Sequence, residues 1–150
     1  LTALADVLGV SFASLFVAEG DQKRGRKKKS ANGHGADGDG EVVIRSGRRA
    51  KLKLWRSGIH KQLLTEPDAG SRLSYFLMHM EPGATSGEEL YSHSGREAGL
   101  VMEGRLRLTV GEETWDLERG DSFSFASNRP HRFVNAARGR TVIVMVHVPG

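Results

Sequence analysis

Apolar and polar residues alternate with a period of two through much of residues 41–150. The clearest runs are "RLRLTV" at 105–110 and "SFSF" at 122–125, in which every second side chain is apolar. This period is typical of β-strands that bury one face. The runs of strand-like composition are EVVIR (41–45), AKLKLW (50–55), IHKQLL (59–64), RLSYFLMHM (72–80), AGLVME (98–103), RLRLTV (105–110), ETWDL (113–117), SFSF (122–125), HRFVN (131–135) and TVIVMVHV (141–148).

Turn-forming sequences separate these runs, among them "EPGATSG" at 81–87, "RGD" at 119–121 and "SNRP" at 127–130. Glycine and proline at these points end one strand before the next begins. Because no helical period lies between the runs, we expect a mainly β domain, folded as an antiparallel sandwich or barrel. The mouth of such a barrel favours the binding of a small molecule.

Residues 1–20 have a different period, in which apolar residues recur every three or four positions and predict a helix. Gly9 interrupts this stripe, and Ser11 is a suitable N-cap for a second short helix. We therefore expect two helices joined by a tight turn. The apolar positions are Leu4, Leu8, Phe12, Leu15 and Phe16.

Residues 21–40 are basic and then glycine-rich, a composition that predicts a linker. The run "DQKRGRKKKS" at 21–30 holds six Lys or Arg and one Asp, so its own net charge is +5. Because the whole chain has a formal net charge of +4, the remaining residues together carry −1. Two interpretations stay open for the run from Lys23 to Lys29: a solvated spacer, or non-specific attraction to nucleic-acid phosphates.

Charge and composition also bear on location. Asp6 interrupts the apolar N-terminal stretch, and the basic run follows that stretch instead of preceding it, which argues against a membrane span or a signal peptide. The chain has no Cys, so it has no disulfide or thiolate metal site. We expect a cytoplasmic protein without membrane contact, in which any metal is held by His, Asp or Glu.

His93 and Glu97 lie four positions apart, just before the predicted strand 98–103, with Gly95 between them. His131 begins the predicted strand 131–135, directly after Pro130. Two imidazoles and a carboxylate converging from neighbouring strands would form the facial triad of non-haem iron sites. The alternative is that the three are ordinary surface or loop residues, paired with nearby charges or backbone carbonyls.

The same residues belong to two longer patterns that resemble the motifs of cupin domains. His93, Glu97 and Gly104, separated by three and six residues, match the end of the first motif. "LERGDSFSFASNRPHRFVN" matches the second, from Gly120 to Asn135, with Ala126 and Asn128 in place of its usual Pro and Gly. The resemblance implies a double-stranded β-helix, a jelly-roll barrel, over 41–150, with the core motifs in 71–150.

One position departs from the first cupin motif, because Tyr91 replaces a second histidine. The metal set implied by the resemblance is therefore His93, Glu97 and His131, holding one divalent metal, Fe or Zn. The same departure also fits a pocket that binds a small molecule without a metal.

The N-terminal segment "LTALADVLGVSFASLFVAEG" resembles the end of a repressor-type, XRE-like helix-turn-helix domain. Bacterial regulators that join such a domain through a linker to a C-terminal cupin form a known family. The resemblance implies that 1–20 is an incomplete, N-terminally truncated remnant of a DNA-binding domain, whose groove-reading helix would precede Leu1. We therefore assign no DNA-binding residue.

Three functions stay open from the sequence. The first is a transcriptional regulator, expected to be a homodimer that binds DNA when its full N-terminus is present and whose cupin binds a small-molecule effector. The second is a mononuclear non-haem iron enzyme, of the oxygenase or epoxidase kind. The third is a cupin binding module alone. The expected effector-binding residues are Tyr75, Tyr91, His93, Glu97 and His131.

Overall fold

The structure, a computed structural model, describes residues 42–54, 57–65 and 72–150. The predicted helices of 1–20 and the predicted linker of 21–40 lie outside these residues. The described part contains one short 3-10 helix, η2 (Ser46–Arg48), and is otherwise built from strands and turns. The strands are β1 (Lys51–Leu54), β2 (Ile59–Leu63), β3 (Ser74–Met80), β4 (Arg96–Glu103), β5 (Arg105–Val110), β6 (Glu113–Glu118), β7 (Ser122–Ala126), β8 (His131–Asn135) and β9 (Thr141–Val148).

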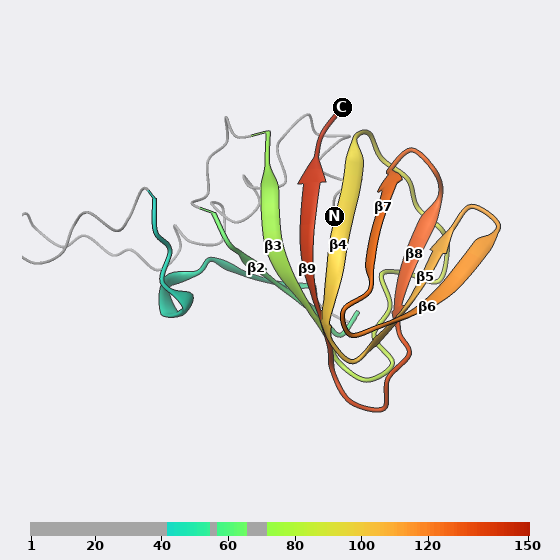
Figure 1. The fold of residues 1–150 in the computed structure, drawn as a ribbon, viewed down its shortest axis with the longest axis horizontal. Coiled ribbons are helices and arrows are strands. Elements are labelled where there is room, and N and C mark those ends of the chain that lie inside the picture. The colour runs from blue at the N-terminus through green and yellow to red at the C-terminus, as the bar shows by residue number, and fades with distance from the viewer. Residues whose placement is uncertain (1–41, 55–56, 66–71) are drawn as a thin grey trace, which may run out of the picture.

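The strands form two antiparallel sheets (Figure 1). The larger sheet has the order β1-β2-β3-β9-β4-β7, and the smaller has the order β6-β5-β8. The last strand, β9, lies between β3 and β4. Figure 1 shows β3, β9, β4 and β7 side by side, with β8, β5 and β6 forming the second sheet to their right.

Alternation along the strands places one row of side chains from each sheet in a shared core. In β3 every second residue is buried, from Ser74 to Met80, and β2 has the same pattern. In β5 the predicted inward positions, Leu106, Leu108 and Val110, are all buried. The period-two pattern in the sequence therefore identified the core face of these strands correctly.

The predicted strand at 41–45 and the predicted start of the strand at 98–103 are both wrong. Residues 42–45, the described part of the predicted strand "EVVIR", form no strand, and Val42 is largely exposed. The strand predicted at 98–103 begins earlier, at Arg96, which places Glu97 inside β4. Cross-strand hydrogen bonding decides this boundary, because Arg96 and Glu97 pair with β7 and β9.

Asn135, the last residue of the second motif, connects three parts of the fold. Its side-chain Nδ2 donates to the carbonyls of Met80 and Gly139 at 3.0 and 2.8 Å. Its Oδ1 accepts hydrogen bonds from the Ala137 N–H and the Thr141 hydroxyl, at 2.8 and 2.7 Å. The side chain is buried and its hydrogen-bonding groups are satisfied, so it stabilises the junction of β8 with β3 and β9.

Two motif glycines allow a test of how tightly the sheets pack. Gly104 and Gly120 both have positive φ angles, +81° and +96°. A Cβ on Gly104 would lie 2.4 Å from Thr141 Oγ1, whereas a Cβ on Gly120 would meet nothing within 4 Å. We expect Gly120→Ala to lower the free energy of unfolding by about 1 kcal/mol, from backbone strain alone. Gly104→Ala should cost ~3 kcal/mol, because it adds a clash. Urea unfolding measures both, and equal losses would contradict the packing described.

Candidate metal centre

Backbone hydrogen bonds bring His93 and His131 together from distant parts of the chain. Tyr91 and His131 form a two-way bridge, in which each backbone N–H donates to the other residue's carbonyl, with N to O distances of 3.1 and 2.8 Å. Two residues later, His93 N donates to Ser127 O at 3.0 Å, and Ser127 N donates to Gly95 O at 2.9 Å. The segment 91–95 therefore lies against the turn that precedes β8, which fixes the relative position of the two histidines.

Gly95 turns the chain from this segment into β4. Its φ is +100°, and a Cβ there would lie 2.2 Å from the carbonyl oxygen of Val148. Only glycine fits such a conformation and so close a backbone approach. Directly after the turn, Glu97 takes an inward position on β4, opposite Phe125 of β7 and His147 of β9. The carboxylate thus enters the barrel from a strand that is hydrogen-bonded on both sides.

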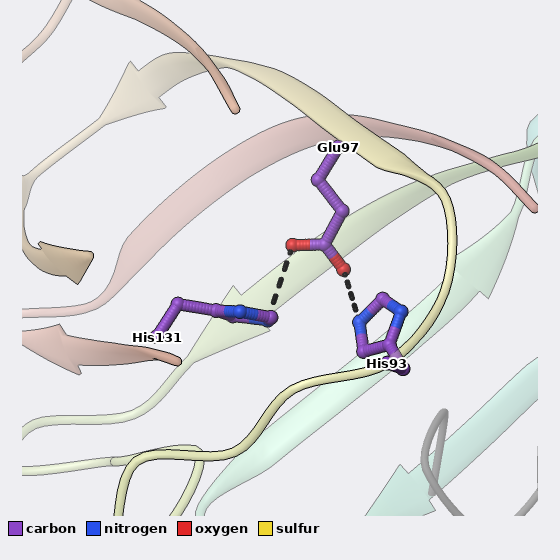
Figure 2. Close-up of side chains that lie close together, drawn as sticks. All are labelled: His93, Glu97 and His131. Atoms are coloured by element: carbon purple, nitrogen blue, oxygen red, sulfur yellow. Dashed lines mark hydrogen bonds and ion pairs between the residues drawn. The ribbon is translucent and has the colours of Figure 1, made fainter. Parts of the chain in front are cut away.

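The side chains of His93, Glu97 and His131 converge inside the barrel (Figure 2). Glu97 Oε1 lies 3.1 Å from His93 Nε2, and Glu97 Oε2 lies 3.6 Å from His131 Nε2. Both imidazoles are fully buried, and the Glu97 side chain is 5% exposed. One donor atom from each residue lies within 4.8 Å of the other two.

The hydrogen bonds on the far side of each ring determine which nitrogen faces the carboxylate. His93 Nδ1 lies 3.0 Å from the Ser94 carbonyl, and His131 Nδ1 lies 2.8 Å from the Arg129 carbonyl. A carbonyl only accepts, so each Nδ1 carries a hydrogen, and in a neutral ring each Nε2 then presents a lone pair. Two such lone pairs beside a carboxylate repel it unless a proton or a metal ion lies between them.

The residues present fit a divalent cation. Glu97 Oε2 and His131 Nε2 are both buried and have no hydrogen-bond partner. Neutral imidazole nitrogens and a carboxylate are a donor set suited to Zn(II) or Fe(II). The carbonyls of Ser94 and Arg129 orient the rings, as second partners of metal-binding histidines usually do.

The pKa directions agree with this donor set. Burial raises the pKa of Glu97, but a hydrogen bond from His93 and the positive charges of His131, His93 and Lys61 outweigh it when the imidazoles are protonated, and hold the pKa below its usual value. A proton on an imidazole then takes the place that a metal ion would take beside the carboxylate. Burial lowers the pKa of His131, against the opposing effects of the Arg129 carbonyl and the Glu97 charge. An ionised carboxylate and a neutral imidazole are the forms that bind a metal.

The two tyrosines expected in the pocket lie in different places. The Tyr91 ring centroid is 4.3 Å from that of His131 and 6.1 Å from that of His93, so Tyr91 contacts the triad. Burial first, and the Glu97 charge second, raise the pKa of the Tyr91 phenol well above its usual range, so it stays neutral. Tyr75 alternates with the buried Ser74 and Phe76 on β3 and points away from the barrel interior.

Two further side chains, which the sequence interpretation missed, lie near the triad. Lys61 is buried on the inward row of β2, with its Nζ 4.7 Å from the centroid of the Phe76 ring. His147 is buried on β9, with its ring centroid 4.9 Å from that of His93 and its Nε2 3.2 Å from the Ser94 carbonyl. Their positions in "IHKQL" and "TVIVMVHV" put both on apolar rows, which was the available signal.

The sequence and fold of this region match known proteins. Residues 76–147 match the family described as Cupin domain. The HTH-type transcriptional regulator PuuR of Escherichia coli (strain K12) is 29% identical over 98 residues, covering 65% of this chain and 52% of that protein; PuuR of Shigella flexneri matches equally. The chain spans about half the length of the curated relatives it matches.

Solved structures share the fold. An RmlC-like cupin from Shewanella frigidimarina NCIMB 400 superposes with a TM-score of 0.62 and 18% identity, covering 73% of this chain and 92% of that one. The Cupin_2 domain of an XRE family transcriptional regulator from Enterobacter cloacae gives a TM-score of 0.55 and 21% identity, covering 62% and 98%. The jelly-roll barrel predicted from the two motifs is confirmed. In the described part of the chain, no helix has the length and apolar character needed to cross a membrane.

The buried Lys61 yields a prediction about stability. Burial lowers its pKa to about 8, although the Glu97 charge opposes the shift. Between that value and the ordinary pKa the unfolded chain binds more protons at Lys61 than the folded chain does. The free energy of unfolding therefore rises as pH rises through this window, and below the window the buried ammonium lowers it by a constant amount. We expect Lys61→Met to unfold at a higher urea concentration than wild type at pH 7, because its free energy of unfolding should be larger by roughly 3 kcal/mol. This difference should shrink towards pH 10.

The matched control is Lys51→Met, which removes an exposed lysine from the neighbouring strand β1. Its stability difference from wild type should stay small and independent of pH. A Lys61→Met variant whose difference from wild type does not change between pH 7 and pH 10 would show that the ammonium is not desolvated in the fold.

Proposed function

We propose that this protein, whose residues 76–147 match the Cupin domain family, is a transcriptional regulator whose barrel binds a small-molecule effector. The relationship to PuuR supports a regulator, and the fold is that of the cupin domain of an XRE family regulator. The sequence of 1–20, with its resemblance to repressor-type helices, supports a DNA-binding partner domain. The observation that carries the sensing role is the buried, polar triad beside a mainly apolar core.

The triad would hold one divalent metal, Fe or Zn, through His93, Glu97 and His131. A metal held by three protein ligands keeps open positions that bind oxygen or nitrogen donors of a small molecule. The neutral Tyr91 ring, which packs against His131, would contact a bound effector. Without a metal, the same four side chains would bind a polar effector directly.

Effector binding would reach the DNA through a homodimer and the linker, in a cytoplasmic protein. The coupling requires that the effector bind one arrangement of barrel and DNA-binding domain better than another. The basic run between Lys23 and Lys29 would add attraction to DNA phosphates that weakens steeply with salt.

A second candidate function rests on the donor set itself. Two histidines and one carboxylate are the ligands of non-haem Fe(II) oxygenases, and His93, Glu97 and His131 supply that set. In an enzyme these residues would hold iron, which would supply redox chemistry at its open positions. The enzyme is distinguished from the regulator by consumption of O₂ in the presence of substrate.

Metal content tests the triad. We expect elemental analysis of the purified chain, loaded anaerobically with Fe(II) or with Zn(II), to find about one ion per chain, because the donors converge in a buried site. His93→Ala should lose the ion while keeping its β-sheet circular dichroism. His79→Ala, which removes an imidazole from the outward row of β3, should keep it. Equal metal content in all three proteins would place the ion elsewhere, and metal-free wild type after loading would remove the enzyme and the metal-dependent sensor.

DNA binding tests the regulator directly. The protein would be made with whatever coding sequence precedes Leu1 in its gene, and its binding to promoter DNA of that gene and its neighbours followed by band shift. We expect a specific complex in excess competitor DNA, and an affinity that changes when Glu97→Gln alters the triad. Folded protein that binds specific and competitor DNA alike would contradict the regulator and favour a binding module or an enzyme.

A further inference from the structure

A groove opens where the two sheets fail to join, between β6 and β7. Within the described residues β6 pairs with β5 and β7 pairs with β4, so each is an edge of its sheet. Residues of these two strands, together with Leu108 and Val110 of β5 and with Arg129, line a groove of about 240 Å³. Its apolar wall comes from Leu108, Trp115, Leu117, Phe123 and Phe125.

We propose that this groove binds a small aromatic carboxylate, with the ring between the side chains of Trp115 and Phe123 and the carboxylate on Arg129. Binding here requires neither a metal at the triad nor DNA, so the site stands apart from the regulator proposed above. Pockets for small molecules combine an apolar lining with a few placed polar groups, and the groove has that composition. Its volume limits the ligand to about a dozen non-hydrogen atoms.

The aromatic walls favour a planar, apolar ligand body. Trp115 is 40% exposed, although it stands on the inward face of β6 opposite Leu108, and Phe123 is half-buried. The rings of Phe123 and Phe125 lie nearly parallel, at an interplanar angle of 27° and 6.1 Å between centroids. A planar ring that enters the groove would cover apolar surface that water now contacts, and would gain ring contacts.

Arg129 supplies the charge that favours a carboxylate. It lines the groove from the turn between β7 and β8, and its side chain is 49% exposed. Its guanidinium makes only long contacts, 3.4 Å from Nη2 to the Val110 carbonyl and 3.8 Å to Glu113 Oε1. A guanidinium has five N–H donors in a planar fork, so donors remain for a bidentate contact with a ligand carboxylate.

Phe125 connects the groove with the triad. Its ring forms part of the groove wall, and its centroid lies 4.9 Å from that of His131. Phe125 is also the cross-strand partner of Glu97. A ligand in the groove would therefore lie one side chain away from the triad, without touching it.

Trp115 provides the readout. The chain has two tryptophans, so the Trp55→Phe variant leaves the fluorescence of Trp115 alone. Benzoate and phenylacetate are the probes, with benzamide as the uncharged control of the same shape. We expect a saturable change in emission with both acids, and an affinity for benzamide about tenfold weaker than for benzoate.

Two matched arginine variants separate the groove from general charge effects. Arg129→Gln should weaken binding of benzoate about tenfold and leave that of benzamide unchanged. Arg138→Gln removes the same charge from an exposed turn and should change neither. His93→Ala should retain benzoate affinity, because the groove binds without the triad.

Three outcomes would overturn the proposal. Emission that shows no saturation with either acid up to millimolar concentrations would mean that the groove takes no such ligand. Loss of benzoate binding in His93→Ala, with Arg129→Gln unaffected, would place the acid at the triad. A second copy of the chain would be the occupant if sedimentation showed a dimer that Trp115→Ser converts to monomer, and if wild type bound neither acid.

Discussion

The buried carboxylate of Glu97 is the constraint on which the interior of this barrel depends. A desolvated charge costs several kcal/mol unless charged or polar groups compensate it. Here His93 and His131 stand on either side of the carboxylate, and Lys61 lies on the inward face of β2. The Tyr91–His131 bridge and the turn at Gly95 hold the two histidines in that place. Local backbone structure therefore serves the electrostatic requirement of a single side chain.

Residues of the two sequence motifs have two different physical roles. His93, Glu97 and His131 present donor atoms to one another inside the barrel. Asn135 and Gly104 present nothing to the site. Asn135 binds backbone carbonyls from two other segments, and Gly104 lets its own backbone approach the backbone at Thr141 closely. The interior is polar around the triad and mainly apolar at the groove between β6 and β7. Phe125 lies between these two regions.

The barrel and the grouping of the three triad residues could both be predicted from the sequence, because both depend on patterns within short stretches of the chain. Alternation identified inward rows, and motif spacing selected three residues whose side chains meet. Prediction failed where pairing with neighbouring strands of the same chain decides the local structure. The strand at Arg96 exists because β7 and β9 pair with it, residues 42–45 form no strand despite their composition, and Tyr75 takes the outward side of β3. Lys61 and His147 stand on apolar rows that the sequence pattern shows, but that pattern alone does not say which side chains of the opposing strands they meet, and both were missed.

The X-ray absorption spectrum of the zinc-loaded chain tests the central claim, that the triad is a metal centre, most directly. We predict a shell of nitrogen and oxygen donors at about 2.0–2.2 Å, with the multiple-scattering signature of two imidazoles. Sulfur should be absent from that shell, since the chain has no Cys. A spectrum of oxygen donors without imidazole scattering, unchanged when His131 is replaced by Ala, would contradict it and leave the buried His93, Glu97 and His131 as a polar pocket.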